Sequence, residues 1–557
     1  MQIFGRPGGA SAQAPSGVDA LPPTLTEQIA AMRRRYRRMD ARRALAFWWY
    51  RIALVVLGGC LGAILGEVVA LQWKIVLAVL LAPLIVFLMV RRLEVGLVLM
   101  GAAAAPLFPP VGSVKSVAIY PAEAALGLLL VAVIVLAAFR VRVFVWPSLW
   151  AIWPQIGIIA LAIISEILIQ VTWTPRVPHR INSTPVLYSE LLGIVQYCVP
   201  LAIIVVTTAC LTGREHWIIR LENAILLLAG LAALMVCIEF KRIGADVYMY
   251  RYTEPMIFYM QLGALAQYIG LGAMIAYARA LCADHWRMRL AYLALTALCV
   301  AAVYFTLENS RWVYTGIGLI VITLVFSRRL FLSLCALSLP LIPVALSVFN
   351  NIMAVKGTRD SNRLTVWQDM LRIWSKHPVF GVGPGNVWSY DQISTNLPLY
   401  LRNLASDGLG VAHNGVLQIL TELGPLGVVC YYAFALLVMI MAIRLYRRSR
   451  TPEQRADRIL ALICLGLVVG SLAADPVSGI FFLPPSQIGG WNDLPRVMST
   501  WIMFGCLIYK DTIWRTGRRV AEMARRRVSP DDEAEPAAAA SAVVTAPGDL
   551  APALPQP

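Results

Sequence analysis

Charged side chains are scarce in this sequence. Only 14% of its 557 residues are Asp, Glu, Lys or Arg, and 59% are hydrophobic, whereas soluble domains carry about 25% charged residues. This shortage of charge excludes one large soluble domain. Apolar runs of about 20 residues, long enough to cross a bilayer, recur along the chain, and the ten-residue alternation of membrane β-barrels is missing. The composition therefore predicts an all-α polytopic membrane protein.

Motifs for nucleotides, metals and disulfides are also missing. The glycine-rich segment GVGPGN at 381–386 lacks the Lys-Ser/Thr pair that ends a phosphate-binding loop, and Pro384 has no amide hydrogen to donate. We interpret this segment as a tight turn. None of the ten cysteines has CxxC spacing, so we expect buried thiols rather than a zinc site or a disulfide framework. No Asp-rich metal motif is present, and we predict neither a metal nor a cofactor.

The apolar runs predict about 12–14 transmembrane helices and one large loop. The candidate spans are 47–66, 74–90, 94–110, 121–139, 149–172, 187–211, 217–239, 256–280, 288–307, 311–327, 330–349, 412–442, 458–474 and 495–509.

Basic residues cluster at alternate span ends, as in MRRRYRR at 32–38 and RLYRRSR at 444–450. The positive-inside rule then places both termini in the cytoplasm and the loop at 350–411 on the far, periplasmic side. The net charge of +17 is explained by this topology and by attraction to anionic lipids. Membrane lipids are therefore expected partners, and nucleic acid is not.

The sequence divides into five predicted regions, and it shows no cleavable signal peptide, so the first span is interpreted as a signal anchor. The regions are a disordered basic cytoplasmic N-terminus (1–46), transmembrane helices (47–349), the periplasmic loop with an amphipathic helix (350–411), further transmembrane helices (412–510), and a basic, then Ala/Pro-rich cytoplasmic tail (511–557).

The most informative segment is the long polar interval at 359–424. Arg363, Trp367, Met370 and Trp374 recur at the spacing of one helical face. Asp360 or Ser361 can cap a helix that starts near Asn362, and Pro378 ends it. These residues predict a short amphipathic helix at the membrane interface with tryptophan anchors.

Arg363 lies in the first turn of this predicted helix, where the helix dipole disfavours a cation. An anionic ligand would remove that cost, because free amides and the guanidinium would bind it together. Pairing of Arg363 with Asp360 or with a lipid phosphate is the alternative.

His413 begins the next apolar span. Its near-neutral pKa suits proton abstraction, although an interfacial histidine can also be structural. Glu422 lies inside that span and is costly unless it is paired. Arg311 is predicted at the same membrane face as Arg363 and His413. Two arginines and a histidine suit a diphosphate-bearing lipid substrate, because arginine holds phosphate oxygens in a fork.

Three segments together resemble the O-antigen ligase/polymerase family. They are Ser310-Arg311, NRLTVWQDMLRIWSKHPVFGVGPGN and HNGVLQILTELGPLG. This family includes O-antigen ligases, O-antigen polymerases, exopolysaccharide polymerases and protein O-oligosaccharyltransferases. The resemblance covers roughly residues 255–445. Trp312 departs from the family pattern, in which small residues commonly follow the arginine.

The resemblance implies a fold like that of GT-C membrane glycosyltransferases, in the bacterial inner membrane. It implies transfer of a glycan from an undecaprenyl-diphosphate carrier to a glycan or lipid A-core acceptor, with inversion and without a metal. A chain-length regulator is a possible partner. The site residues that it implies are Arg311 and Arg363 at the diphosphate, His413 at the acceptor hydroxyl, and Arg359, Trp367 and Asn414 as further substrate-binding residues.

Polymerisation of an exported polysaccharide is the interpretation that we favour. An O-antigen ligase, a protein O-oligosaccharyltransferase and a transporter of the lipid-linked glycan are the alternatives. The transporter alone predicts that His413 is dispensable.

Overall fold

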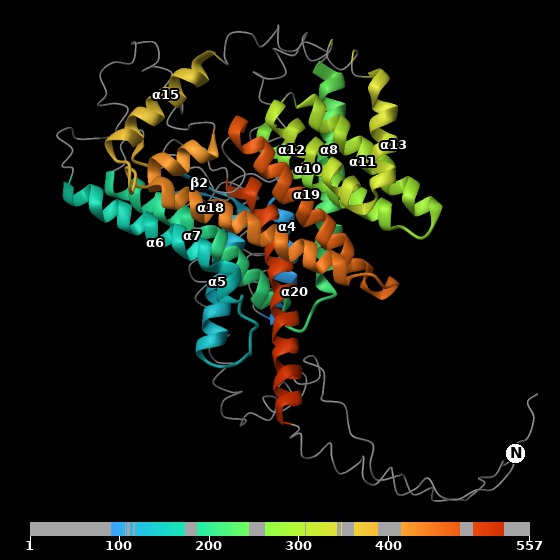
Figure 1. The fold of residues 1–557 in the computed structure, drawn as a ribbon, viewed down its shortest axis with the longest axis horizontal. Helices are drawn as coiled ribbons and strands as arrows, with labels where there is room; N and C mark the ends of the chain where they lie inside the picture. The colour runs from blue at the N-terminus through green and yellow to red at the C-terminus, as the bar shows by residue number, and fades with distance from the viewer. Residues whose placement is uncertain are drawn as a thin grey trace, which may run out of the picture. The chain divides into compact units, whose positions relative to one another are not determined.

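The computed structural model describes residues 91–105, 107, 112–114, 117–172, 186–243, 262–306, 308–341, 343, 347, 361–387, 414–478 and 494–527. The chain forms two compact units, one of residues 52–512 and one of residues 1–51 and 513–557. The described residues are helical apart from short connections and one small hairpin (Figure 1). The predicted all-α polytopic membrane class is confirmed.

Nine helices in the described part of the chain are long and apolar enough to cross a membrane, and each coincides with a predicted span. They are α5 (Pro121–Ala138), α6 (Leu149–Thr172), α7 (Val186–Leu211), α8 (Trp217–Ile243), α10 (Leu262–Cys282), α11 (Trp286–Phe305), α12 (Asn309–Phe326), α18 (Gly415–Arg448) and α19 (Arg455–Ser478).

The remaining elements are shorter or less apolar. They are α4 (Leu93–Ala103), β1 (Gly112–Val114), β2 (Val117–Ile119), α13 (Arg328–Ser338), η1 (Leu339–Leu341), α15 (Ser361–Lys376), η2 (Pro452–Gln454) and α20 (Leu494–Arg527). The two strands pair antiparallel, with Ser113 opposite Ala118. The first two predicted spans lie outside the described residues, so the total of 12–14 spans stays a prediction.

Glycines allow α12 and α19 to approach each other closely. A Cβ atom at Gly470 would lie 2.5 Å from the carbonyl oxygen of Tyr314, and one at Gly466 would lie 3.0 Å from that of Gly318. Small residues at such contacts let two membrane helices pack backbone against backbone. Helix α19 also packs against α18 and α10, and α18 packs against α6. This packing places the helix that carries Arg311 close to the helices around α18.

Nine cysteines fall in the described residues, and all nine are free thiols. Four of them are buried, as expected, but Cys335 on α13 is exposed. Its exposure corrects the expectation of buried thiols, because no side chain of α13 is buried against the other described helices.

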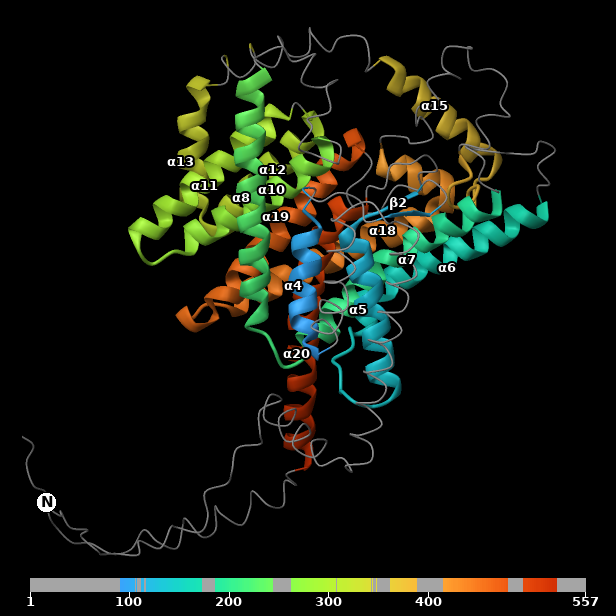
Figure 2. The ribbon, with the colours of Figure 1, turned by 180° about the vertical axis from the view of Figure 1, so that it is seen from behind.

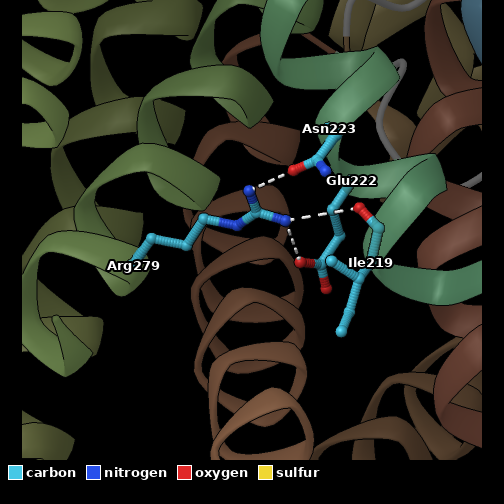
Figure 3. Close-up of polar contacts among 4 residues, drawn as sticks. All are labelled: Ile219, Glu222, Asn223 and Arg279. Carbon is cyan, nitrogen blue, oxygen red and sulfur yellow. Dashed lines mark hydrogen bonds and ion pairs between the residues drawn. The ribbon is translucent and has the colours of Figure 1, made fainter. Parts of the chain in front are cut away.

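Ion pairs join the helices at one end of the 52–512 unit. Arg279, in the last turn of α10, points toward the first turns of α8 (Figure 3). Its guanidinium donates to Glu222 Oε2 at 2.7 Å, to Asn223 Oδ1 at 2.5 Å and to the Ile219 carbonyl oxygen at 3.5 Å. Both members of the ion pair are almost completely buried, so each needs the other to offset the loss of water.

The same end contains further pairs. Lys510 of α20 bridges Glu215 at 2.5 Å and Asp457 at 2.9 Å, and Arg214 lies 2.9 Å from the buried Glu94 of α4. We call this region the charged end, defined by Glu94, Arg214, Glu215, Glu222, Arg279, Asp457 and Lys510. These pairs link α4, α8, α10, α19 and α20, or the residues that directly precede them.

Candidate active site

Helix α15 lies beside the first part of α18 in both views (Figures 1 and 2). The predicted bounds of this loop helix are confirmed, since it runs from Ser361 to Lys376 and ends before Pro378. From Val366 onward, where its side chains are described, Met370 and Ile373 are buried and Val366 is partly buried against the same cluster.

One residue of the predicted face of α15, Met370, is buried against the rest of the protein. Met370 and Ile373 pack with Leu417 of α18 and with Val382 of the turn that follows α15, whereas Trp367 and Trp374 are half-buried and their role as interfacial anchors stays a prediction. Trp374 donates through Nε1 to the Pro378 carbonyl oxygen at 3.2 Å.

The predicted site residues fall partly within the described chain. Arg363 is the third residue of α15, and its side chain lies outside the described atoms. Trp367 follows one turn later and is half-buried. Arg359 and His413 lie outside the described residues. Asn414 caps α18, since its Oδ1 accepts a hydrogen bond from the Leu417 amide at 3.1 Å.

Arg311 is the third residue of α12 and is almost fully buried. Its Nε donates to the Gly263 carbonyl oxygen of α10 at 3.1 Å. The neighbouring Trp312 points elsewhere: its Nε1 donates to the Val303 carbonyl oxygen at 3.0 Å, and its ring stacks on Tyr304. The Trp312 side chain therefore packs against the end of α11, whereas the Arg311 side chain contacts α10.

The glycine-rich segment after α15 is a tight turn, as predicted. Gly381, Gly383 and Gly385 all have positive φ angles, of 69°, 85° and 75°, which non-glycine residues rarely adopt. The amides of Val382 and Gly383 donate to carbonyl oxygens of α18 at 2.9 Å and 3.0 Å. These two donors are therefore engaged with the protein rather than arranged to cradle a phosphate.

Helix α18 breaks where the turn meets it. Gly424 has φ 72° and ψ −173°, and Pro425 has no amide hydrogen. The carbonyl oxygens of Thr421 and Glu422 thereby lose their usual helical donors. The Thr421 oxygen accepts from Val382 instead, and the Glu422 oxygen accepts from Gly383 and from the Ser165 hydroxyl of α6.

The side chain of Glu422 is fully buried, and it is paired, as expected. Its Oε2 accepts from the Tyr197 hydroxyl of α7 at 2.6 Å, and its Oε1 accepts from the Gln418 amide at 2.5 Å. Sequence reasoning missed a second buried acid, Glu166 of α6, whose Oε2 accepts from Asn386 at 2.9 Å. An ionisable residue inside a predicted span was the available signal.

Comparison with known proteins finds a family match for the region that contains Arg311, Arg363 and Glu422. Residues 289–432 match the family model described as O-antigen ligase. This segment is similar to the O-antigen ligase family, and we refer to residues 289–432 as the O-antigen ligase domain. The match confirms the resemblance over roughly a quarter of the chain, from α11 to the first half of α18. No curated protein matches the chain.

The O-antigen ligase domain contains Arg311, Arg363 and His413 and also the break at Gly424. The helices that complete the surroundings of Glu422 come from outside it, because Ser165, Glu166 and Tyr197 precede the matched residues. The domain is thus packed into helices that the family match does not include.

A third buried acid lies beside the start of α18. A Cβ atom at Gly415 would be 2.5 Å from Oδ2 of Asp475, and the same oxygen accepts from the Tyr431 hydroxyl at 2.7 Å. Gly415 is only two residues from His413 in sequence. Sequence reasoning missed Asp475 because it lies just beyond a predicted span, 458–474, whose contacts with α18 are not visible in the sequence.

Two groups of the loop have shifted pKa values. Burial raises the pKa of Asp369 on α15, while the nearby Arg372 opposes this rise. Burial and the neighbouring Lys376 lower the pKa of His377 below its ordinary value of 6.5. In the part of the chain that the structure describes, no cluster of three or more His, Cys, Asp or Glu side chains could hold a metal.

Proposed function

We propose that this protein transfers a glycan from an undecaprenyl-diphosphate carrier to an acceptor hydroxyl on the periplasmic face of the bacterial inner membrane. The O-antigen ligase domain is the single observation that carries this proposal, since it spans the three residues expected to act. Glycan transfer of the ligase/polymerase type follows from that domain. The carrier, the face of the membrane and the residue roles belong to the proposal.

Arg311 and Arg363 bind the donor diphosphate in this mechanism. Each is the third residue of its helix, where the positive end of the helix dipole favours an anion. The two guanidinium groups stabilise the negative charge that grows on the leaving diphosphate. Arg359, Trp367 and Asn414 complete the proposed substrate contacts.

His413 takes the proton of the acceptor hydroxyl. The acceptor oxygen then forms a bond to the anomeric carbon from the side opposite the diphosphate. The bond between that carbon and the diphosphate oxygen breaks, the electron pair leaves with the diphosphate, and the configuration inverts. The proton stays on His413 until the diphosphate or water removes it. No residue of this scheme requires a metal.

Polymerisation of an exported polysaccharide is the reaction that we favour, with a second lipid-linked glycan as the acceptor and a chain-length regulator as an expected partner. An O-antigen ligase would use the lipid A core instead, and a protein O-oligosaccharyltransferase would use a serine or threonine. In the proposed topology both termini are cytoplasmic.

The proposal is tested with the purified protein in lipid nanodiscs and a lipid-linked glycan donor. His413→Ala is expected to abolish transfer, because the acceptor hydroxyl loses its base. His285→Ala is the matched control. This exposed histidine directly precedes α11, near the charged end, and has no role in the proposed mechanism. Full transfer by His413→Ala would overturn the mechanism. Translocation of the donor without any transfer would favour the transporter.

A further inference from the structure

The turn after α15 and the break in α18 form one joint. We define the joint as residues 379–383 together with residues 421–425. Two amides of the turn donate to the two carbonyl oxygens that the break leaves without helical donors. A Cβ atom at Gly424 would overlap the Val379 carbonyl oxygen, so only glycine allows the two backbones to approach this closely.

Side chains from two other helices hold the joint in place. Tyr197 of α7 donates to the Glu422 carboxylate, and Ser165 of α6 donates to the Glu422 carbonyl oxygen. Glu166 of α6 accepts from Asn386, the last residue of the glycine-rich turn. A Cβ atom at Gly193 of α7 would lie 3.0 Å from Pro384. The turn is therefore fixed against α6 and α7 as well as against α18.

The joint also links the two segments that carry the proposed reaction. Helix α15, with Arg363 in its first turn, ends three residues before Val379. Helix α18 begins at Gly415, two residues after His413 in the sequence, and reaches the joint at Thr421. Contacts of Met370 and Ile373 with Val382 and Leu417 bridge the two segments, and the Thr421 hydroxyl lies 3.5 Å from the Met370 carbonyl oxygen.

We propose that this joint positions the helix that bears Arg363 against the helix start that bears His413, and that Gly424 and Glu422 are positioning residues for the transfer. The inference rests on the proposed function for the reaction, whereas the link between the loop and α18 rests on contacts alone. Neither residue touches substrate in this scheme. Each residue acts by fixing the irregular backbone of the joint, which connects the two segments that carry the reacting groups.

Gly424→Ala tests the inference. The added methyl group must push Val379 away, and the φ of 72° is strained for alanine. We expect transfer to fall roughly 100-fold, the loss typical of a misplacement of about 1 Å, with the loss mainly in kcat. Gly316→Ala is the matched control, because a Cβ atom at this exposed α12 position meets nothing within 4 Å.

Hydrogen exchange of the same variants, followed by mass spectrometry, provides a readout that does not depend on activity. Gly424→Ala is expected to raise exchange in the peptides of residues 361–387 and 414–424, with the charged end unchanged. Glu422→Gln is a milder second variant that keeps the shape of the side chain. It replaces the carboxyl group that Tyr197 and Gln418 contact by an amide, and we expect roughly a tenfold loss of transfer.

The outcomes separate the two proposals. Unchanged exchange in residues 361–387, or exchange raised equally in all helices, would overturn the positioning role whatever happens to transfer. Raised exchange confined to the loop and the start of α18, together with lost transfer, supports it. If the wild-type protein transfers nothing but Gly424→Ala still loosens only these peptides, the proposed function fails and the link between the loop and α18 stands.

Discussion

The charged end and the joint hold buried acids in different ways. At the charged end, Glu222 is paired directly with Arg279 of a neighbouring helix. At the joint, Glu422 accepts hydrogen bonds from the neutral side chains of Tyr197 and Gln418, while its carbonyl oxygen accepts from the turn. Ion pairs thus connect regular helices to each other, whereas neutral hydrogen bonds hold an irregular backbone. The difference separates a region that keeps the helices together from a region that shapes a site.

Removing one member of the buried ion pair should have the largest effect. Arg279→Ala leaves Glu222 buried without its cation, which costs about 3–5 kcal/mol of the free energy of unfolding. Denaturation of the detergent-solubilised protein measures this loss. Arg279→Ala combined with Glu222→Gln should recover part of it, because no charge then remains buried. An equal loss in both variants would contradict the assigned role of the pair.

Arg311 contacts Gly263 at the start of α10, whereas Arg279 lies in the last turn of that helix. Loss of Arg311 should affect the reaction rather than the stability. Arg311→Ala is expected to lower transfer by about 100- to 1000-fold, as for other groups that stabilise growing negative charge. Arg311→Lys keeps the positive charge but loses the fork that can hold two phosphate oxygens. Its transfer rate should therefore lie between those of the wild type and Arg311→Ala. Rates are compared per amount of folded protein. An equally large loss of transfer rate in Arg279→Ala would show that the charged end and the Arg311 region do not differ in this way.

Asp475→Asn should have a smaller effect on transfer. The amide oxygen can still accept from the Tyr431 hydroxyl, but the charge beside the first residue of α18 is lost. We expect roughly a tenfold lower rate, the scale of one hydrogen bond to a charged group. Tyr431→Phe serves as the comparison, since it removes the donor and keeps the carboxylate. Wild-type rates in Asp475→Asn would show that its carboxylate only supports packing.

The pH dependence of the loop should show the smallest effect. His377 has a lowered pKa in the folded protein, so the unfolded chain binds its proton more readily and stability falls as pH decreases below about 6.5. The protection factors of α15 amides, which correct for the intrinsic pH dependence of exchange, should therefore fall when the pH is lowered from 7.5 to 5.5. His377→Gln should flatten this dependence, because glutamine does not titrate there. The same slope in both proteins would assign the dependence to another group.

The membrane class, nine of the helices and the bounds of α15 could be predicted because each depends on local properties. A run of about 20 apolar residues is sufficient for a span, and Pro378 is sufficient to end a helix that starts near Ser361. The resemblance of Arg311, Arg363 and His413 to a family pattern also lies in the sequence, and the family match covers all three residues.

Contacts between distant segments could not be predicted in the same way. The sequence placed Met370 on one face of α15 with the tryptophans, but it did not show that Met370 and Ile373 pack against Leu417 of α18. The single predicted span at 412–442 is broken at Gly424, and the carbonyl groups freed there pair with a turn about 40 residues earlier in the chain.

The sequence by itself determined that this is a polytopic helical membrane protein with an O-antigen ligase-like polar loop, because hydropathy and local spacing are properties of neighbouring residues. Only the tertiary structure decided that the glycine-rich turn is fixed to the break in α18 and that Tyr197 satisfies Glu422. The physical reason is that a buried hydrogen-bonding group must find a partner, but its position in the sequence does not specify which distant segment supplies that partner.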